Sequence, residues 1–183
     1  MNFDHRKHGF SLIELIIVIS ILGIVAAVAM PNMFLGNSQK LDVASTELAD
    51  AIRFARAEAI RTGTPHGVWY FPFPTKLSVY RLVYVGGAAI PTYDVRHPVD
   101  KKLYSLDYSN NGNQAPVKIG VVTLNYGGSA INREYISFDD HGVPNYSNGE
   151  TYQMLDNASI VLVYAGQSSM VSIAPMTGRV VVQ

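Results

Sequence analysis

One apolar segment near the amino terminus constrains this chain more than any other feature of its sequence. No charged residue occurs from Leu15 to Gln39, and within Leu12–Met30 only Glu14, Ser20 and Gly23 interrupt the apolar character. About 20 apolar residues in a helix span the hydrocarbon core of a bilayer. The sequence therefore predicts a transmembrane helix in this segment.

The residues around this segment bear on its orientation and fate. Residues 1–9 form a short head that carries Arg6 and Lys7, and positive flanks of a membrane helix stay on the cytoplasmic side. The remainder of the chain is therefore expected to face outward. An ordinary cleavable signal peptide is the alternative. Its small-x-small site, Ala27–Ala29, leads directly into Met30-Pro31 and a further helical pattern, so this alternative fits less well.

Glu14 is the one charged residue inside the apolar segment. A carboxylate near the start of a membrane helix is costly, so such a residue indicates a function and a partner. The next charged residue along the chain is Lys40, beyond the membrane helix. We therefore expect the partner of Glu14 to lie on another chain.

Helical periodicity continues beyond the apolar segment. Proline disrupts a helix interior and glycine weakens it, so Pro31 and Gly23 are candidate kinks. Apolar residues then recur at intervals of three and four, which predicts an amphipathic helix packed by one face on a sheet. Gly63 followed by Pro65 is typical of a helix end. The recurring apolar residues are Leu41, Ala44, Leu48, Ala51, Ile52, Ala55 and Ala59.

After Gly63 the pattern changes to short segments rich in β-branched and aromatic residues, which predict antiparallel strands. Residues 86–116 hold many Gly, Pro, Asn and Tyr residues and are expected to form a long loop, with turns at residues 127–128 and 145–149. The predicted fold class is α+β, with one long amino-terminal helix packed on an antiparallel β-sheet head. The predicted strands are His66–Phe71, Lys76–Val85, Val117–Tyr126, Tyr135–Phe138, Ser159–Tyr164, Met170–Ala174 and Arg179–Val182.

The remaining motifs give little support for catalysis. The chain has no cysteine, which excludes disulfides, Cys-ligated zinc and a thiol nucleophile. Ser168 and Ser169 lack a Gly-x-Ser-x-Gly elbow, and no Gly-Lys-Ser/Thr phosphate loop occurs. The run Asp139–His141 could ligate a metal, but a polar turn closed by Gly142 is the favoured interpretation. We therefore expect no enzyme activity and no cofactor or metal.

Charge gives no general reason to expect nucleic acid as a partner, because 14 Lys and Arg residues balance 14 Asp and Glu residues. DNA binding stays an alternative, although its candidate basic residues are scattered in the sequence. Tyrosines could supply an adhesive surface or subunit contacts, but core and strand packing is expected for most of them. The basic candidates are Arg96, Lys101, Lys102, Lys118, Arg133 and Arg179, and the tyrosines include Tyr80, Tyr84, Tyr93, Tyr104 and Tyr108.

The junction between leader and helix resembles the type III signal of prepilins, and reads Gly9-Phe10-Ser11-Leu12-Ile13-Glu14-Leu15. In that family a membrane aspartyl prepilin peptidase cuts after the glycine, and the new first residue is N-methylated. The resemblance implies cleavage between Gly9 and Phe10 and methylation of Phe10. It also implies that Glu14 pairs with the amino-terminal amine of a neighbouring subunit and sets register during assembly, where two charges costly alone in lipid neutralise each other.

The head resembles, on looser motifs, the GspH/FimT family of minor pilins and pseudopilins. The matching motifs follow in the family's order: Arg53–Ile60 at the end of the helix, then the turns Phe138–Gly142 and Thr177–Arg179. This resemblance implies the pilin fold and a minor structural subunit of a type IV pilus or type II secretion pseudopilus. A DNA-binding or adhesive minor pilin, acting in DNA uptake or surface attachment, is the alternative. Some pseudopilin heads bind calcium, but no ligand set maps onto this chain.

The expected layout has four parts: a cleaved leader (1–9), a transmembrane and filament-core helix (10–31), its amphipathic continuation (32–63) and a globular β head (64–183). We expect a single-pass inner-membrane protein with its head in the periplasm, later incorporated into a pilus or pseudopilus. The implied partners are other pilin or pseudopilin subunits, the prepilin peptidase, the inner-membrane assembly platform and membrane lipid, with DNA not favoured. Pilus, type II secretion and competence systems share all these features.

Overall fold

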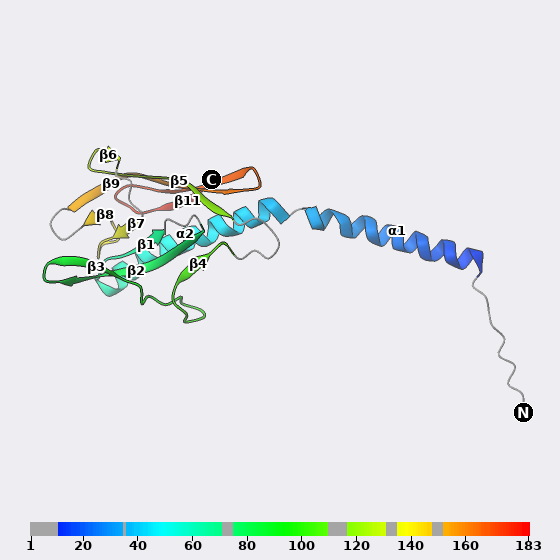
Figure 1. The fold of residues 1–183 in the computed structure, drawn as a ribbon, viewed down its shortest axis with the longest axis horizontal. Coiled ribbons are helices and arrows are strands. Elements are labelled where there is room, and N and C mark those ends of the chain that lie inside the picture. Colours follow the sequence, from blue (N-terminus) through cyan, green and yellow to red (C-terminus); the bar gives the residue numbers. More distant parts are fainter. Residues whose placement is uncertain (1–10, 35, 71–74, 110–116, 131–134, 148–151) are drawn as a thin grey trace, which may run out of the picture. The chain divides into compact units, whose positions relative to one another are not determined.

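The structure, a computed structural model, describes residues 11–34, 36–70, 75–109, 117–130, 135–147 and 152–183. The chain divides into two compact units, Met1–Asn37 and Ser38–Gln183. The first unit contains helix α1 (Leu12–Phe34), and the second contains helix α2 (Gly36–Thr62) from Ser38 onward together with all the strands (Figure 1). The apolar segment and the head therefore form separate units.

Helix α1 begins at a local capping arrangement. The carbonyl of Ser11 accepts hydrogen bonds from the backbone N–H groups of Glu14, at 3.0 Å, and Leu15, at 3.2 Å. Glu14 lies in the first turn, where its negative charge is favoured by the helix dipole. Gly23 and Pro31 both lie inside α1, so neither residue ends the helix, and a bend at either one stays a prediction.

The apolar side chains of α1 that the structure describes, from Leu12 to Val25, are exposed. From Leu12 to Val25 its large hydrophobic residues are each 47–77% exposed. Among the described residues, no helix combines the length and the hydropathy that a membrane span requires. The membrane-crossing role expected for residues 10–31 stays a prediction.

Helix α2 has the predicted amphipathic character. All seven residues of the predicted apolar stripe, from Leu41 to Ala59, are less than 5% exposed, and they belong to the core of the head. The helix ends as predicted, because Gly63 adopts a φ of +64° and its N–H donates to the carbonyl of Ala59 at 3.0 Å. Burial of this apolar stripe in the core of the head is the main source of stability for the helix.

The strands form one antiparallel system in the order β11-β10-β9-β8-β7-β1-β2-β3, with β4 added to β2, and with β5 added to β9 and itself paired with β6 (Figure 1). The long strand β9 joins the two halves, since its start pairs with β8 and the remainder with β5 and β10. The strands are β1 (His66–Tyr70), β2 (Lys76–Val85), β3 (Ala88–Thr92), β4 (Ser105–Asp107), β5 (Lys118–Tyr126), β6 (Ser129–Ala130), β7 (Tyr135–Phe138), β8 (Pro144–Ser147), β9 (Tyr152–Tyr164), β10 (Gln167–Ile173) and β11 (Val180–Val182).

Two sequence expectations about loops were wrong. The long loop expected over residues 86–116 contains β3 and β4, and residues 145–147 belong to β8 rather than to a turn. Strand β3 includes Pro91 and lies at the sheet edge, where a proline is tolerated, so its sequence carried a loop pattern. The predicted turn at residues 127–128 is confirmed by positive φ at both glycines.

The sheet also buries a tyrosine on the face away from Val68 and Val79. Gly67 pairs with Tyr80 across β1 and β2, and the Tyr80 side chain is 1% exposed. A Cβ at Gly67 would lie 2.6 Å from the Tyr80 hydroxyl and 2.2 Å from the Ile136 carbonyl oxygen. The glycine therefore makes room for the ring, and packing accounts for this tyrosine as it does for Tyr104 and Tyr108, whereas Tyr84 and Tyr93 are exposed.

Candidate functional sites

The residues predicted to direct processing lie at the edge of what the structure describes. Gly9 and Phe10 fall outside the described residues, so their predicted roles in cleavage and methylation stay predictions. Glu14 lies in the first turn of α1, five residues from the predicted cut, with an exposed side chain. Its predicted partner, the amine of another subunit, would meet an accessible carboxylate at the start of an apolar helix.

The three motifs that suggested the head family come together at one junction. The Arg56 Nε donates to the carbonyl of Gly142 at 3.0 Å, and the Arg53 Nη2 donates to the carbonyl of Val180 at 3.1 Å. The helix motif thus holds the turn after β7 and the start of β11, although these segments are far apart in the chain. The junction attaches α2 to two turns of the sheet.

Both glycines of the junction are required by its geometry. Gly142 has a φ of +75°, and a Cβ there would lie 2.6 Å from the Ile60 Cδ1. Gly178 has a φ of +62°, and a Cβ there would lie 2.8 Å from the Cδ and the Nε of Arg56. A side chain at either position would displace α2 residues from the turns.

The run Asp139–His141 is a structural turn. The Asp139 Oδ1 accepts hydrogen bonds from the N–H groups of His141, at 3.0 Å, and Val143, at 2.8 Å, while its Oδ2 accepts one from the Tyr152 hydroxyl at 2.9 Å. The carboxylate is therefore occupied in closing the turn. No group of three or more potential metal-ligating side chains occurs within the described ranges.

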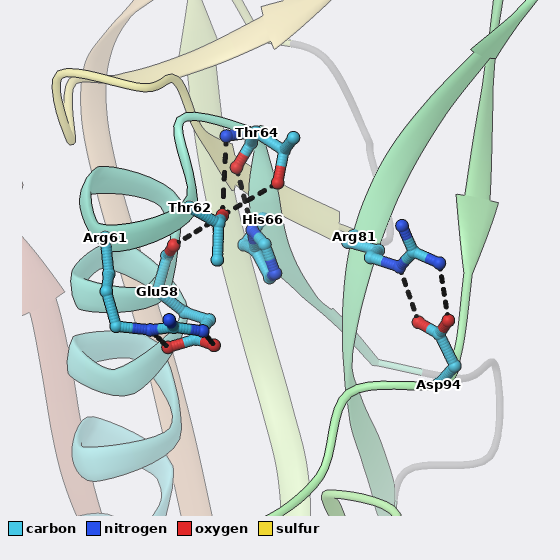
Figure 2. Close-up of polar contacts among 7 residues, drawn as sticks. All are labelled: Glu58, Arg61, Thr62, Thr64, His66, Arg81 and Asp94. Atoms are coloured by element: carbon cyan, nitrogen blue, oxygen red, sulfur yellow. Dashed lines mark hydrogen bonds and ion pairs between the residues drawn. The ribbon is translucent and has the colours of Figure 1, made fainter.

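A polar pocket of about 480 Å³ lies beside the carboxyl end of α2. Figure 2 shows the His66 ring of β1 between the last turns of α2, which carry Glu58 and Thr62, and Arg81 on β2. The His66 Nδ1 lies 2.7 Å from the Thr64 carbonyl oxygen, an acceptor. Neutral His66 therefore carries its proton on Nδ1 and leaves Nε2 as an acceptor. The pocket is lined by Glu58, Thr62, Thr64, His66, Arg81, Asp94, Val95 and Arg96.

Both carboxylates of this pocket are paired with arginines of the head. Arg81 donates from Nε and Nη2 to the Asp94 carboxylate at 2.7 and 2.6 Å, and Arg61 makes a bidentate pair with Glu58 (Figure 2). The hydrogen bond from Arg81 lowers the pKa of Asp94, and that from Arg61 lowers the pKa of Glu58. Both carboxylates are neutralised by guanidinium groups, which leaves little negative potential to hold a cation.

Burial sets the ionisation of His66. The side chain is 3% exposed, and loss of hydration lowers its pKa below the ordinary value of 6.5. The hydrogen bond to Thr64 and the Glu58 charge act in the opposite direction, with Arg81 and Arg61 reinforcing the decrease. The sequence placed His66 at the start of a predicted strand but gave no sign of this pocket, because the residues that line it come from separate segments of the chain.

The basic residues considered for DNA binding are divided between different parts of the head. Arg96, Lys101 and Lys102 gather on one loop, whereas Lys118 lies on β5 and Arg179 lies next to β11. Arg133 falls outside the described residues. Among the described basic residues, the structure therefore brings together only those that are already close in the sequence, and the scatter that weighed against a DNA-binding surface persists.

Comparisons with known proteins agree with the amino-terminal pattern. Residues 4–30 match the model of the prokaryotic N-terminal methylation motif. The chain is 30% identical to the pilin-like protein PilA1 of Thermus thermophilus over 138 residues, which cover 75% of this chain and 80% of that relative.

Two solved structures are similar to this chain, at low sequence identity and with TM-scores below 0.5. The minor pseudopilin EpsH from the type 2 secretion system of Vibrio cholerae has a TM-score of 0.48 and 12% identity, covering 79% of this chain and 96% of EpsH. The type IV minor pilin FimU of Pseudomonas aeruginosa has a TM-score of 0.46 and 16% identity, covering 80% of this chain and 90% of FimU. By its identity to PilA1 and its methylation motif, the chain belongs to the type IV pilin-like proteins.

Proposed function

We propose that this chain is a minor pilin or pseudopilin, a structural subunit of a type IV pilus or a type II secretion pseudopilus. The observation that carries this proposal is the surface of α1, whose large side chains from Leu12 to Val25 are all exposed. The apolar surface of such a helix must be shielded from water, either by lipid or by similar helices of other subunits. A subunit that moves from a membrane into a filament meets both surroundings in turn.

Before assembly, the helix serves as an anchor. Residues 10–31 cross the inner membrane once, and the basic residues of the leader keep the amino terminus on the cytoplasmic side. The head, residues 64–183, then lies in the periplasm, attached through the amphipathic helical segment 32–63. The anchored protein waits for extraction by the inner-membrane assembly platform.

Processing precedes assembly. The prepilin peptidase removes residues 1–9 by cutting between Gly9 and Phe10, and Phe10 is N-methylated. The new amino terminus of one subunit carries a positive charge, which pairs with the Glu14 carboxylate of a neighbouring subunit. Pairing of these charges relieves the cost of each in lipid, so it selects one axial register for the incoming subunit.

The intact mass of the membrane-extracted protein tests this proposal. The expected result is that residues 1–9 are lost and one methyl group is added to Phe10. Both changes should occur only when the prepilin peptidase is present. Replacement of Gly9 by a bulky residue such as Leu should leave the precursor uncut. A precursor that keeps its leader with active peptidase, or a cut near Ala29, would contradict the proposal.

A further inference from the structure

A small hairpin of residues 95–104, called the basic hairpin below, projects from the head between β3 and β4. Its base is buried, with Val95 8% and Tyr104 7% exposed, and the Tyr104 N–H donates to the Val95 carbonyl at 2.8 Å. Arg96 and Leu103 form an antiparallel bridge, and the His97 N–H donates to the Lys102 carbonyl at 2.8 Å. The hairpin is therefore a preformed structure anchored in the core.

The tip of the basic hairpin is held by its own side chains. The Arg96 Nη1 donates to the Lys101 carbonyl at 2.8 Å, and the Lys101 Nζ donates to the Pro98 carbonyl at 2.7 Å. Asp100 accepts from the Lys102 N–H at 3.1 Å and lies 3.4 Å from the His97 Nδ1. Three permanent cations and one carboxylate leave a net positive tip, and the cations are exposed.

The same tip presents large apolar side chains to solvent. Val99 is 82% exposed, the highest value among the large hydrophobic residues that the structure describes, and Leu103 is 57% exposed. The hydrogen-bonded turn leaves Val99 exposed to solvent rather than packed on the head. Cationic and apolar side chains therefore share one projecting surface.

We propose that the basic hairpin docks on the anionic phospholipid surface of the membrane in which the chain is anchored. Lys and Arg near such a surface are attracted to lipid phosphates, and exposed aliphatic side chains enter the boundary between headgroups and acyl chains. The proposal rests on the proposed membrane anchoring. A tethered head is held close to the bilayer, so weak contacts of this kind suffice to dock it.

The apolar tip favours lipid over nucleic acid as the occupant. Phosphate contacts to DNA use cations and polar groups, and nothing in them requires exposed aliphatic side chains such as Val99 and Leu103 on the same hairpin. Lipid headgroups offer the same phosphate charge together with an apolar layer beneath it. Docking holds the head at the membrane before assembly, and departure of the subunit into a filament releases it.

The absence of cysteine makes a direct test simple. A Val99→Cys variant of the full chain carries an environment-sensitive fluorophore and is reconstituted into vesicles of phosphatidylcholine, with or without phosphatidylglycerol. The control places the same fluorophore at Val85→Cys, which is 59% exposed in β2. We expect blue-shifted emission, quenched by spin-labelled lipid, only at position 99, only with the anionic lipid, and weakened by salt.

Charge variants test how much each hairpin lysine contributes to the ratio of docked to free head. Lys101→Gln and Lys102→Gln in the labelled chain should each lower the docked-to-free ratio about fivefold, because each basic residue near an anionic surface contributes about that factor. Lys118→Gln, an exposed lysine on β5, should leave the ratio unchanged. Equal loss with Lys118→Gln, or none with the two hairpin lysines, would overturn the proposal.

Further measurements distinguish lipid from other binding partners of the hairpin, and failure of docking from failure of the membrane anchor. Emission at position 99 that changes with added DNA in neutral vesicles would indicate that the hairpin binds DNA. Emission that changes with protein density at fixed lipid composition would indicate that it contacts a neighbouring head. Either result would refute lipid docking. Vesicle flotation in alkaline carbonate reports anchoring independently. Chains that float but show no change at position 99 refute docking alone, whereas chains that fail to float refute the membrane anchor itself.

Discussion

Arg56 on α2 donates a hydrogen bond from its Nε to the Gly142 carbonyl at 3.0 Å, across 86 positions of the chain. The contact joins the end of the helix to the turn that follows β7, and the backbone of Gly178 packs against the same side chain. Motifs that were separate in the sequence thus form one junction between helix and sheet.

Arg56→Ala is expected to lower the free energy of unfolding by about 2 kcal/mol, because a partly buried carbonyl loses a charged donor. Urea unfolding of the full chain in detergent measures the change. Arg61→Ala removes the same residue type from the same helix, but Arg61 is exposed, and within the described part of the chain its ion pair is with Glu58, one turn away on the same helix. It should change stability little, and an equal effect of both variants would argue against the junction.

Gly67→Ala is expected to destabilise the head by about 2–3 kcal/mol, because its Cβ would overlap the Ile136 carbonyl oxygen and the Tyr80 hydroxyl. Adding Tyr80→Phe should not restore stability, since the backbone contact remains. Gly120→Ala is the matched control, with its nearest atoms at 3.3 Å. Thermal unfolding checks all three variants, and full rescue by Tyr80→Phe would show that the hydroxyl alone limits the space.

His66 is expected to make stability depend on pH below about 6.5. Its folded pKa is lowered by burial, so between the folded value and 6.5 the unfolded chain binds more protons. The stability contributed by neutral His66 is therefore complete above pH 6.5 and declines as the pH falls. Glu58 and Asp94 have lowered pKa values and lose their contributions only below 4.5 and 3.8.

The midpoint of thermal unfolding between pH 7.5 and 5.0 checks this dependence. His66→Gln stays neutral throughout, so its midpoint should fall less over this range than that of the unchanged chain. Subtracting the two curves removes the contributions of all other titrating groups. Parallel curves for the two proteins would contradict a lowered His66 pKa.

Glu14→Gln and Glu14→Ala are expected to leave insertion and leader cleavage intact while lowering incorporation into filaments about tenfold or more. The reason is the loss of one partner of an ion pair formed in a low-dielectric surrounding. Ser20→Ala, on the same helix, serves as the control, because its hydroxyl bonds to the Ile16 carbonyl of its own helix. Filaments that contain the Glu14 variants at normal levels would refute the register role.

Much of the architecture follows from local pattern alone. The stripe from Leu41 to Ala59 predicted the buried face of α2, and Gly63 predicted its end, because both depend on residues within a few turns of each other. Strands β1, β2, β5 and β7 were likewise predicted from β-branched and aromatic runs. The edge strand β3 was missed, since its pairing with β2 outweighs a sequence that reads as loop.

The sequence by itself determined the chain's class, because an apolar helix, its single acidic residue Glu14 and a methylation motif are contiguous in the chain. Only the tertiary structure decided which distant residues meet. It brought Arg56 to Gly142, seated Tyr80 against Gly67, and enclosed His66 among paired charges. The physical reason is the distance along the chain between the interacting residues. Helices and leader signals depend on residues close in sequence, whereas these contacts depend on strand register and close packing across the whole head.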